Sequence, residues 1–545
     1  MNGVDASAII PVSMTLSARF PQTMIRLRSQ FSLNGCSALE RVLLALIAVV
    51  IGYSIFVLAW SISQPLIEAH SFRQTQTALS TYWMLQGEPL IAYETPVKGA
   101  PWVIPFEFPV FQYSAALLAL IGIPLDDAGR IAAFVYFLAC AWPIGMIARS
   151  LRLGRFGTLA LLALFFASPI NLYWARAFMI ESCALFFSLL CLAFLLRAGE
   201  TRRIRDLVVA AGAGALGVLA KSTTLPAFSL LGGFYFLYLA YRKLVIEREI
   251  SAIWFLSAFG IALIVPYIVG LSWVAYADSL KEQSVLGSAL TSGALKKWNY
   301  GEFPLRFSEK LWIETLAQRT FPDILGFASA IGVGFCLAAL TSLRLTIFVG
   351  FCVVAFLTPM MIFTNLHVHH NYYQTANSVF MLAAIAIALT ALFEIGKKRA
   401  ATLALAVILA GQISYFQVHY FQTVRNPPEF LTQWRIIARE ARDLTPPDSA
   451  LYFFGYSWSS VIPYYAERKS VALSKERGER LRNAFENPST YLGGLELGAV
   501  VVCVPQPPEV QAYLSNRDVL SQYGRCQLLG PEQKPAERTE EPPTN

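Results

Sequence analysis

Two glutamates stand where an acid can do chemistry at a membrane surface. Glu107 lies between two phenylalanines and directly before the Phe108-Pro109 pair, and Glu181 opens a long apolar stretch. Desolvation among aromatic rings raises the pKa of a carboxyl group and suits it to abstract a proton. An ionisable residue at the mouth of a membrane span marks a functional site by default. We therefore expect Glu107 or Glu181 to be a general base, with an ordinary helix N-terminal acid as the alternative for Glu107.

Three cations in the same parts of the sequence suit an anionic ligand. Lys221 ends an apolar stretch and is followed by Ser222 and two threonines, a setting that fits a lipid phosphate. Arg73 also suits a phosphate, because a guanidinium binds it through two hydrogen bonds. Arg176 precedes Glu181 by five residues and can pair with it or with an anionic ligand. The structural alternative for Arg176 is an ion pair with a glutamate that only holds the fold. For Lys221 it is an ordinary lysine at a helix end whose ammonium extends to the water at the membrane surface.

Two polar segments rich in histidine and aromatic residues complete the set of candidates. The first runs from His70 to Gln74, and the second reads His-Val-His-His-Asn-Tyr-Tyr-Gln from His367 to Gln374. From these segments we expect five contacts to phosphate and sugar groups: His70, Gln74, His369, His370 and Tyr372. Three histidines in one turn can also bind a divalent metal, with Glu181 as a further ligand, or form a merely solvated turn. No other cofactor is expected.

The elements that must position these residues are membrane helices. The 545 residues are 56% hydrophobic and 14% charged, whereas soluble domains average about 45–50% and about 25%. Repeated apolar stretches of roughly 20 residues predict an α-helical polytopic membrane protein. We expect eleven spans, near residues 42–63, 129–148, 156–171, 180–196, 207–221, 226–241, 250–273, 322–341, 345–363, 375–394 and 400–418. Residues 110–121 are too short to cross a core of ~30 Å and should form an interfacial helix in the first outer loop.

The distribution of arginine and lysine predicts the orientation of the chain. Basic residues concentrate in alternate loops and near the N-terminus, and by the positive-inside rule that side is the cytoplasm. The net charge of +8 therefore reflects topology, and we expect no nucleic-acid partner. The opposite side receives the outer loop 64–128, the loop 274–320 and everything after Val418. We expect a bacterial inner-membrane protein with a cytoplasmic N-terminus and all the candidate residues on the outer face.

Changes in composition divide the chain into four parts. Residues 1–40 form a cytoplasmic N-terminal segment, 41–420 the transmembrane domain, 421–530 a small soluble α/β domain in the periplasm, and 531–545 a charged, proline-rich disordered tail. Cys503 and Cys526 fall in the outer domain, where an oxidising compartment lets a disulfide persist. Two buried thiols are the alternative.

The order of these pieces resembles that of the type C membrane glycosyltransferases, in the branch with the protein O-mannosyltransferases and the lipid A aminoarabinose transferase. Over about residues 40–420, Glu107-Phe108-Pro109 resembles the segment before that family's short helix. The turn from Arg176 to Glu181 resembles its Arg…Asp turn, and Leu219-Ala220-Lys221 resembles its lysine-ended span. The resemblance implies transfer of a hexosyl or pentosyl group from a polyprenyl-phosphate donor to a lipid, glycan or protein acceptor.

One departure from the family concerns the first outer loop. Where the family carries an Asp-Glu pair as the presumed base or metal contact, this chain reads His70-Ser-Phe-Arg73, with Glu68 just upstream. Glu107 or Glu181 must then have taken over, or the chain is a polysaccharide ligase or polymerase, or a non-catalytic assembly protein. A transporter is disfavoured, because its ionisable residues would lie within the spans, which here are almost free of them.

Overall fold

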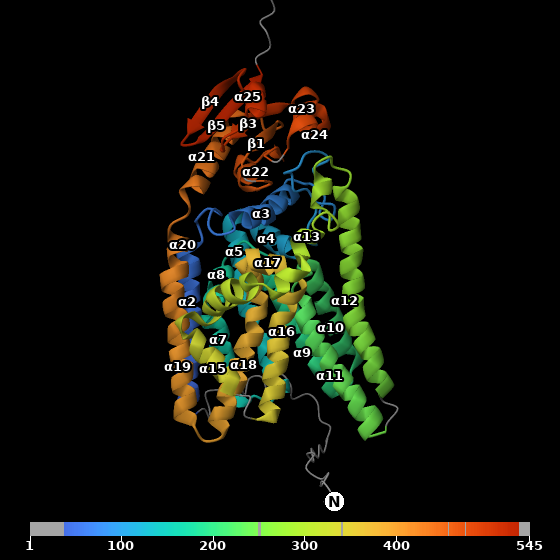
Figure 1. Cartoon of the computed structure of the whole chain (residues 1–545), viewed down its shortest axis with the longest axis vertical. Coiled ribbons are helices and arrows are strands. Elements are labelled where there is room, and N and C mark those ends of the chain that lie inside the picture. Colours follow the sequence, from blue (N-terminus) through green and yellow to red (C-terminus); the bar gives the residue numbers. More distant parts are fainter. Residues whose placement is uncertain (1–36, 249–251, 339–341, 456, 475, 533–545) are drawn as a thin grey trace, which may run out of the picture.

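Figure 1 shows a bundle of long helices that carries a small domain with a β-sheet at one end. The computed structural model describes residues 37–248, 252–338, 342–455, 457–474 and 476–532. Within these ranges, eight helices are long and apolar enough to cross a membrane, and the chain is a multi-pass membrane protein. The expectations for residues 1–36 and 533–545 lie outside the described residues.

The bundle begins at a capping box, in which Ser37 and Glu40 each bind the other's backbone N–H. Its helices are α2 (Ala38–Ser61), α5 (Leu125–Ala139), α6 (Ala141–Ser150), α7 (Gly154–Ala167), α9 (Glu181–Thr201), α10 (Ile204–Ala220), α11 (Leu225–Tyr241), α12 (Ala252–Lys281), α15 (Ser329–Ala338), α16 (Leu343–Ile362), α18 (Gln374–Glu394) and α19 (Lys398–Tyr415). Helical structure occupies all eleven predicted spans. Three of them correspond to helices of only 14, 17 and 17 residues, α7, α10 and α11, so the count of eleven stays a prediction.

Short elements lie between the long helices, mostly at the end near the sheet. The first outer loop contains α3 (Ser71–Leu85) and α4 (Val110–Leu120), so the predicted short helix at 110–121 is confirmed. The others are α8 (Pro169–Trp174), η1 (Arg242–Ile246), η2 (Gly287–Leu290), α13 (Lys296–Tyr300), η3 (Phe303–Phe307), η4 (Lys310–Thr320), α14 (Phe321–Leu325), η5 (Gly326–Ala328), α17 (Thr364–His369), η7 (Asn371–Tyr373), η8 (Phe416–Tyr420) and α20 (Phe421–Arg425).

Helices α9 and α10 form an antiparallel pair that decides where two candidate residues meet. Gly217 lies so close to α9 that an added Cβ would come within 3.0 Å of the Ser188 hydroxyl oxygen. Small residues of this kind let two helix backbones approach in a membrane. Because the pair is antiparallel, the start of α9 at Glu181 lies beside the end of α10, where Lys221 follows.

The C-terminal part is a small α/β domain, as predicted. It contains α21 (Glu429–Leu444), β1 (Ala450–Phe454), α22 (Val461–Ala466), β2 (Lys469–Ala472), α23 (Gly478–Glu486), α24 (Pro488–Leu492), β3 (Leu497–Val502), α25 (Pro508–Leu514), β4 (Arg517–Tyr523) and β5 (Cys526–Glu532). The sheet order is β2-β1-β3-β5-β4, with β1 parallel to both its neighbours and β5 antiparallel to β3 and β4. A disulfide joins Cys503 to Cys526, which confirms the predicted bridge.

The first outer loop is held against this domain by backbone hydrogen bonds. The Ser470 N–H donates to the Pro96 carbonyl at 3.2 Å, and the Ala472 N–H donates to the Val97 carbonyl at 2.9 Å. This segment therefore continues the sheet beyond the edge strand β2. A shared apolar core, which includes Leu66 from the loop and Trp434 from α21, joins the two parts. The outer loop thus lies between the bundle and the C-terminal domain (Figure 1).

Candidate active site

Arg73 and Glu107 form an ion pair at the surface between the bundle and the C-terminal domain. Arg73 lies in the first turn of α3, and one of its terminal nitrogens lies 2.6 Å from Glu107 Oε1. The side chains keep 12% and 23% of their exposure, so solvent still reaches them. Burial acts to raise the pKa of Glu107, but the charge and hydrogen bond of Arg73, together with the charge of Lys221 and a backbone hydrogen bond, lower that pKa overall. The expectation of a raised pKa is wrong because it left out these groups.

The backbone around Glu107 is fixed by two aromatic side chains. The buried Tyr93 hydroxyl donates to the Glu107 carbonyl at 2.7 Å and accepts from the Phe106 N–H at 2.8 Å. The indole of Trp273, in α12, donates to the Phe106 carbonyl at 3.1 Å. Further along, the Phe108 N–H donates to the Leu219 carbonyl near the end of α10. These bonds hold the first outer loop next to Lys221, the residue that follows α10.

Lys221 and Glu181 form a second, more deeply buried ion pair. The Lys221 ammonium lies 2.5 Å from Glu181 Oε1, and the side chains are only 5% and 3% exposed. The ammonium also lies 3.8 Å from the ring centroid of Tyr373 and 4.9 Å from that of Tyr372. The second oxygen of Glu181 is buried without a hydrogen-bond partner. An acid with a free buried oxygen beside a cation is a polar site that a ligand can complete.

Two histidines face each other beside these pairs. His70 has a left-handed backbone, with φ of 51°, and its ring lies 5.1 Å from His370 and 4.8 Å from Tyr372 between centroids. Burial lowers the pKa of His70 to about 4 and that of His370 to about 3. Both rings are therefore neutral at pH 7. They can donate or accept one hydrogen bond, but they add no positive charge for a phosphate.

Arg176 was predicted to pair with Glu181 or with an anionic ligand, and in the structure its partner is Glu68. Its guanidinium forms two hydrogen bonds with Glu68, of 3.0 and 2.5 Å, and does not pair with Glu181. Arg130 contacts the same Glu68 carboxylate at 2.8 Å, and all three side chains are at most 3% exposed. The upstream acid of the first loop is thus enclosed by two arginines. This triad fastens the loop to α5 and to the turn before α9.

Gln74 is likewise committed to the protein itself. Its side chain is fully buried, its amide donates to the Ala69 carbonyl, and its oxygen accepts from the Phe178 N–H. Phe178 in turn packs against Gly129, where an added Cβ would lie 2.2 Å from the ring. Gln74 therefore holds the turn before α9 in place, which corrects its prediction as a substrate contact.

The three histidines between His367 and Gln374 do not form one cluster in the structure. His369 is exposed and stacks on Trp298 at 5.1 Å, whereas His367 is buried and bonds to Gln374. In the described ranges, no three His, Cys, Asp or Glu side chains lie close enough together to hold a metal ion. Glu181 forms its ion pair with Lys221, and a cation directly beside the carboxylate disfavours a divalent metal there.

Some residues of the site carry no signal in the sequence. Tyr373 stands against Lys221, Trp174 packs against His70, and Trp458 of the C-terminal domain stacks on Phe106. Tyr373 is a neighbour of Tyr372 in the polar segment and belongs to the same turn. The contact from Trp458, more than 300 residues away in the chain, has no sequence signal, because it depends on how the C-terminal domain docks.

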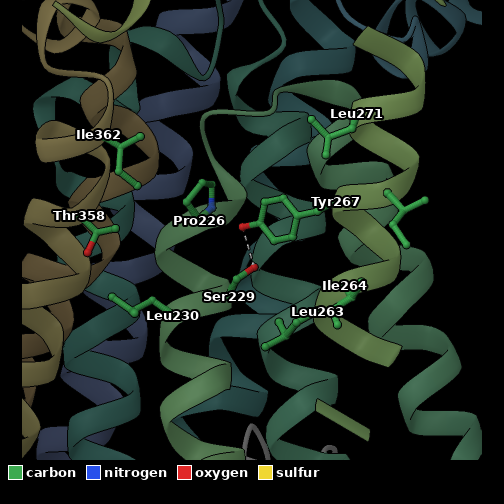
Figure 2. A pocket seen from close by; sticks show the side chains of 10 residues that line it. Pro226, Ser229, Leu230, Leu263, Ile264, Tyr267, Leu271, Thr358 and Ile362 are labelled. Carbon is green, nitrogen blue, oxygen red and sulfur yellow. Dashed lines mark hydrogen bonds between the residues drawn. The ribbon is translucent and has the colours of Figure 1, made fainter. Parts of the chain in front are cut away.

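An apolar groove runs along the bundle, and one of its lining residues, Pro226, follows Lys221 by five positions. It has a volume of about 520 Å³ and lies between α11, α12 and α16 (Figure 2). Its lining is hydrocarbon apart from a few hydroxyls, among them Ser229 and Tyr267, which share a hydrogen bond of 3.1 Å. Ile264, Ile268 and Leu271 of the lining are more than half exposed, so the groove opens on the face of the bundle that lipid covers.

Comparisons with known proteins find this fold but no sequence family. No family model matches the chain, and no curated protein sequence matches it. ArnT from Cupriavidus metallidurans bound to undecaprenyl phosphate superposes with a TM-score of 0.59 at 13% identity, over 89% of this chain and 97% of that one. The archaeal oligosaccharyltransferase AglB from Archaeoglobus fulgidus, in complex with an inhibitory peptide and a dolichol-phosphate, gives 0.52 at 13%, over 86% and 70%.

Both structures are type C membrane glycosyltransferases. The resemblance expected from the order of sequence motifs is therefore confirmed at the level of architecture, over most of the chain. At 13% identity this likeness concerns the fold and leaves the substrates open. The chain has the fold of the type C membrane glycosyltransferases.

Proposed function

We propose that this protein transfers a sugar from a polyprenyl-phosphate donor to a hydroxyl group of a lipid, glycan or protein acceptor. The observation that carries the proposal is that residues lining the apolar groove lie only a few positions along the chain from residues that form or hold the two ion pairs. Pro226 lines the groove five residues after Lys221. Leu271 lines it two residues before Trp273, whose indole binds the carbonyl of Phe106, next to Glu107.

The arrangement suits an amphipathic donor. Isoprenoid chains are hydrocarbon and fit the groove, while Lys221 and Arg73 provide the positive charge that a phosphate requires. The two similar structures are complexes with undecaprenyl phosphate and with dolichol-phosphate, which supports the same class of donor here. The transferred group is then a hexosyl or pentosyl unit at the boundary between lipid and water.

Glu107 is the better placed of the two acids to act as the base. Its side chain is 23% exposed, against 3% for Glu181, so an acceptor hydroxyl can reach it from outside. The acceptor proton passes to Glu107, the acceptor oxygen bonds to the anomeric carbon, and the bond from that carbon to the phosphate oxygen breaks. Lys221 and Arg73 stabilise the charge on the departing lipid phosphate, and Glu181 holds Lys221 in place.

The proposal includes an orientation and a division of the chain. Residues 41–420 form the transfer domain of a bacterial inner-membrane protein, the N-terminal segment lies in the cytoplasm, and residues 421–530 form a periplasmic domain. Reporter fusions at Arg203 and at Asn487 should report opposite sides of the membrane. The same side for both fusions would place the two ion pairs in the wrong compartment and overturn the orientation.

The donor class is tested by binding of two matched lipids. Purified protein should bind undecaprenyl phosphate more tightly than undecaprenol, which has the same chain without the phosphate. Lys221→Ala should weaken undecaprenyl phosphate binding by about tenfold or more, since hydrogen bonds to charged groups contribute about 1.5–3 kcal/mol. The exposed Lys397→Ala, at the far end of the bundle, is the matched control. Equal binding of both lipids, or of neither, would refute the proposed donor.

A further inference from the structure

We propose that Trp458 of the C-terminal domain is a positioning residue of the transfer site, which holds the Arg73–Glu107 pair through the two phenylalanines beside it. The inference deepens the proposed function and rests on it. The Trp458 ring stacks on Phe106 at 5.6 Å with an angle of 18° between the rings. It meets Phe72 edge-on at 6.0 Å and 86°.

The sequence neighbours of these phenylalanines are the charged residues themselves. Phe72 precedes Arg73, and Phe106 precedes Glu107. One indole thus contacts both segments that supply the ion pair. One segment is the start of helix α3, and the other is the loop before α4. A ring that packs on both segments fixes their separation, and aromatic pairs of this geometry contribute about 0.5–1.5 kcal/mol beyond area burial.

Trp458 is itself held rigidly from the other side. It belongs to the loop that follows β1, and Ser460, two residues further on, is buried directly before α22. In α22, Tyr465 accepts a hydrogen bond from the Leu66 N–H at 2.6 Å, and Tyr464 bonds to Asp126 at the start of α5. The C-terminal domain is therefore attached at several points, and through Trp458 it contacts the phenylalanines that precede both members of the ion pair.

Movement of the ion pair changes the ionisation of Glu107. The charged and titratable groups around Glu107 are Arg73 from α3, Lys221 after α10, Tyr93 from the first outer loop and Tyr373 from η7. Arg73 contributes most to the lowering of the Glu107 pKa against the effect of burial. When Trp458 is removed and the pair loosens, that pKa rises toward its ordinary value of about 4.3. Activity is then lost at a higher pH as the solution is acidified.

The test compares three variants of the full chain in parallel: Trp458→Ala, Trp458→Phe and Tyr464→Phe. Turnover is followed with the lipid-linked sugars extracted from cells that lack the protein, and binding is followed with undecaprenyl phosphate. Small misplacement of reacting groups can cost about 10²-fold in rate. We expect Trp458→Ala to lose about 10- to 100-fold in turnover and to move the acidic limb of the pH–rate profile upward. Trp458→Phe should recover most of both.

Tyr464→Phe removes a docking bond of the same domain away from the ion pair, and it should leave turnover and the acidic limb unchanged. Trp458→Phe and Tyr464→Phe should bind undecaprenyl phosphate within about threefold of wild type, because the groove, Lys221 and Arg73 keep their places. If Trp458→Ala behaves like Tyr464→Phe, or if Trp458→Phe is as impaired as Trp458→Ala, the positioning role is wrong although the transfer function stands. Wild-type protein without lipid binding or turnover would instead remove the transfer function, and with it this inference.

Discussion

Two groups of charges differ in character, although Glu68 of the first and Arg73 of the second lie close together in the first outer loop. Glu68 is enclosed by Arg130 and Arg176, and none of the three side chains is more than 3% exposed. Arg73 and Glu107, in contrast, face each other one to one and retain exposure of 12% and 23%. The residue types are the same in both groups. What separates the enclosed group from the pair proposed to react is the number of charged partners and the access of solvent.

The difference follows from the cost of burying charge. A carboxylate removed from water must be compensated almost fully, and Glu68 receives two guanidinium groups. Burial acts to raise the pKa of Glu68, yet Arg176 and Arg130 lower it to about 2. A group held so firmly in one ionisation state is suited to hold structure. The Arg73–Glu107 pair keeps exposed hydrogen-bonding atoms, with which an acceptor or a phosphate can interact.

The strongest test of this contrast is Glu107→Gln. The amide keeps the shape of the side chain but accepts no proton, so turnover of a lipid-linked sugar should fall by about 10²–10⁴-fold. The melting temperature should change little, because the side chain is partly exposed. Glu94→Gln is the control, since Glu94 pairs with Lys469 of the C-terminal domain and stands outside the proposed chemistry. Full activity of Glu107→Gln would return Glu181 as the candidate base.

Glu68→Gln should give the reverse result. Removing the charge leaves two buried guanidinium groups without a counterion, which typically costs about 3–5 kcal/mol of folding stability. Thermal unfolding in detergent measures this loss, with Glu107→Gln as the comparison. In the wild type, the stabilisation from Glu68 is complete above its unfolded pKa of about 4.3 and is lost as the pH falls toward its folded pKa of about 2. A wild-type stability that stays constant from pH 5 to 2 would contradict the assignment.

Two arginine-to-lysine exchanges, one in each group, keep the positive charge and change only the geometry of its hydrogen bonds. Arg176→Lys loses the two-pronged contact with Glu68 and should mainly lower the melting temperature. Arg73→Lys keeps one positive charge near the solvent and should mainly weaken undecaprenyl phosphate binding, by about tenfold. Native mass spectrometry of lipid binding and thermal unfolding of the same preparations separate the effects. If both exchanges changed the same quantity, the distinction between the two groups would fail.

The smallest effect concerns the histidines. Burial lowers the pKa of His70 to about 4 and of His370 to about 3, so both rings stay neutral from pH 8 down to about 5. The pH–rate profile should therefore show no histidine step near the ordinary value of about 6.5. His370→Gln should leave the shape of the profile between pH 5 and 8 unchanged. A step near pH 6.5 that disappears in this variant would show that His370 is charged in the working protein.

The fold was largely predictable because membrane helices can be recognised in a sequence by their length and apolar composition. The first outer loop, the short helix at 110–121 and the α/β character of the C-terminal domain were also predictable from composition. Of the candidate residues, the structure brings seven together in one place: His70, Arg73, Glu107, Glu181, Lys221, His370 and Tyr372. Four of them form the ion pairs Arg73–Glu107 and Lys221–Glu181.

The errors concern partners. Arg176 and Gln74 look like ligand contacts in the sequence, because nothing there reveals that Glu68 and the Phe178 N–H occupy them. Sequence separation hides such contacts: Arg176 lies 108 residues from Glu68, and Gln74 lies 104 residues from Phe178. For the same reason the lowered pKa of Glu107 could not be read from its aromatic neighbours. Burial was visible in the local sequence, and the compensating charge was not.

The strand-like segment 96–98 that extends the sheet has a consequence for how the protein is made. The edge of β2 stays open until this segment covers it, and an uncovered edge is a template for aggregation. The Lys98 side chain and its acceptor carbonyl on Ala472 are 374 residues apart. At about 5–20 residues per second, the ribosome needs roughly 20–75 seconds to traverse that interval. Through all of that time the segment 96–98 lacks the strand with which it pairs, because β2 has not yet been synthesised.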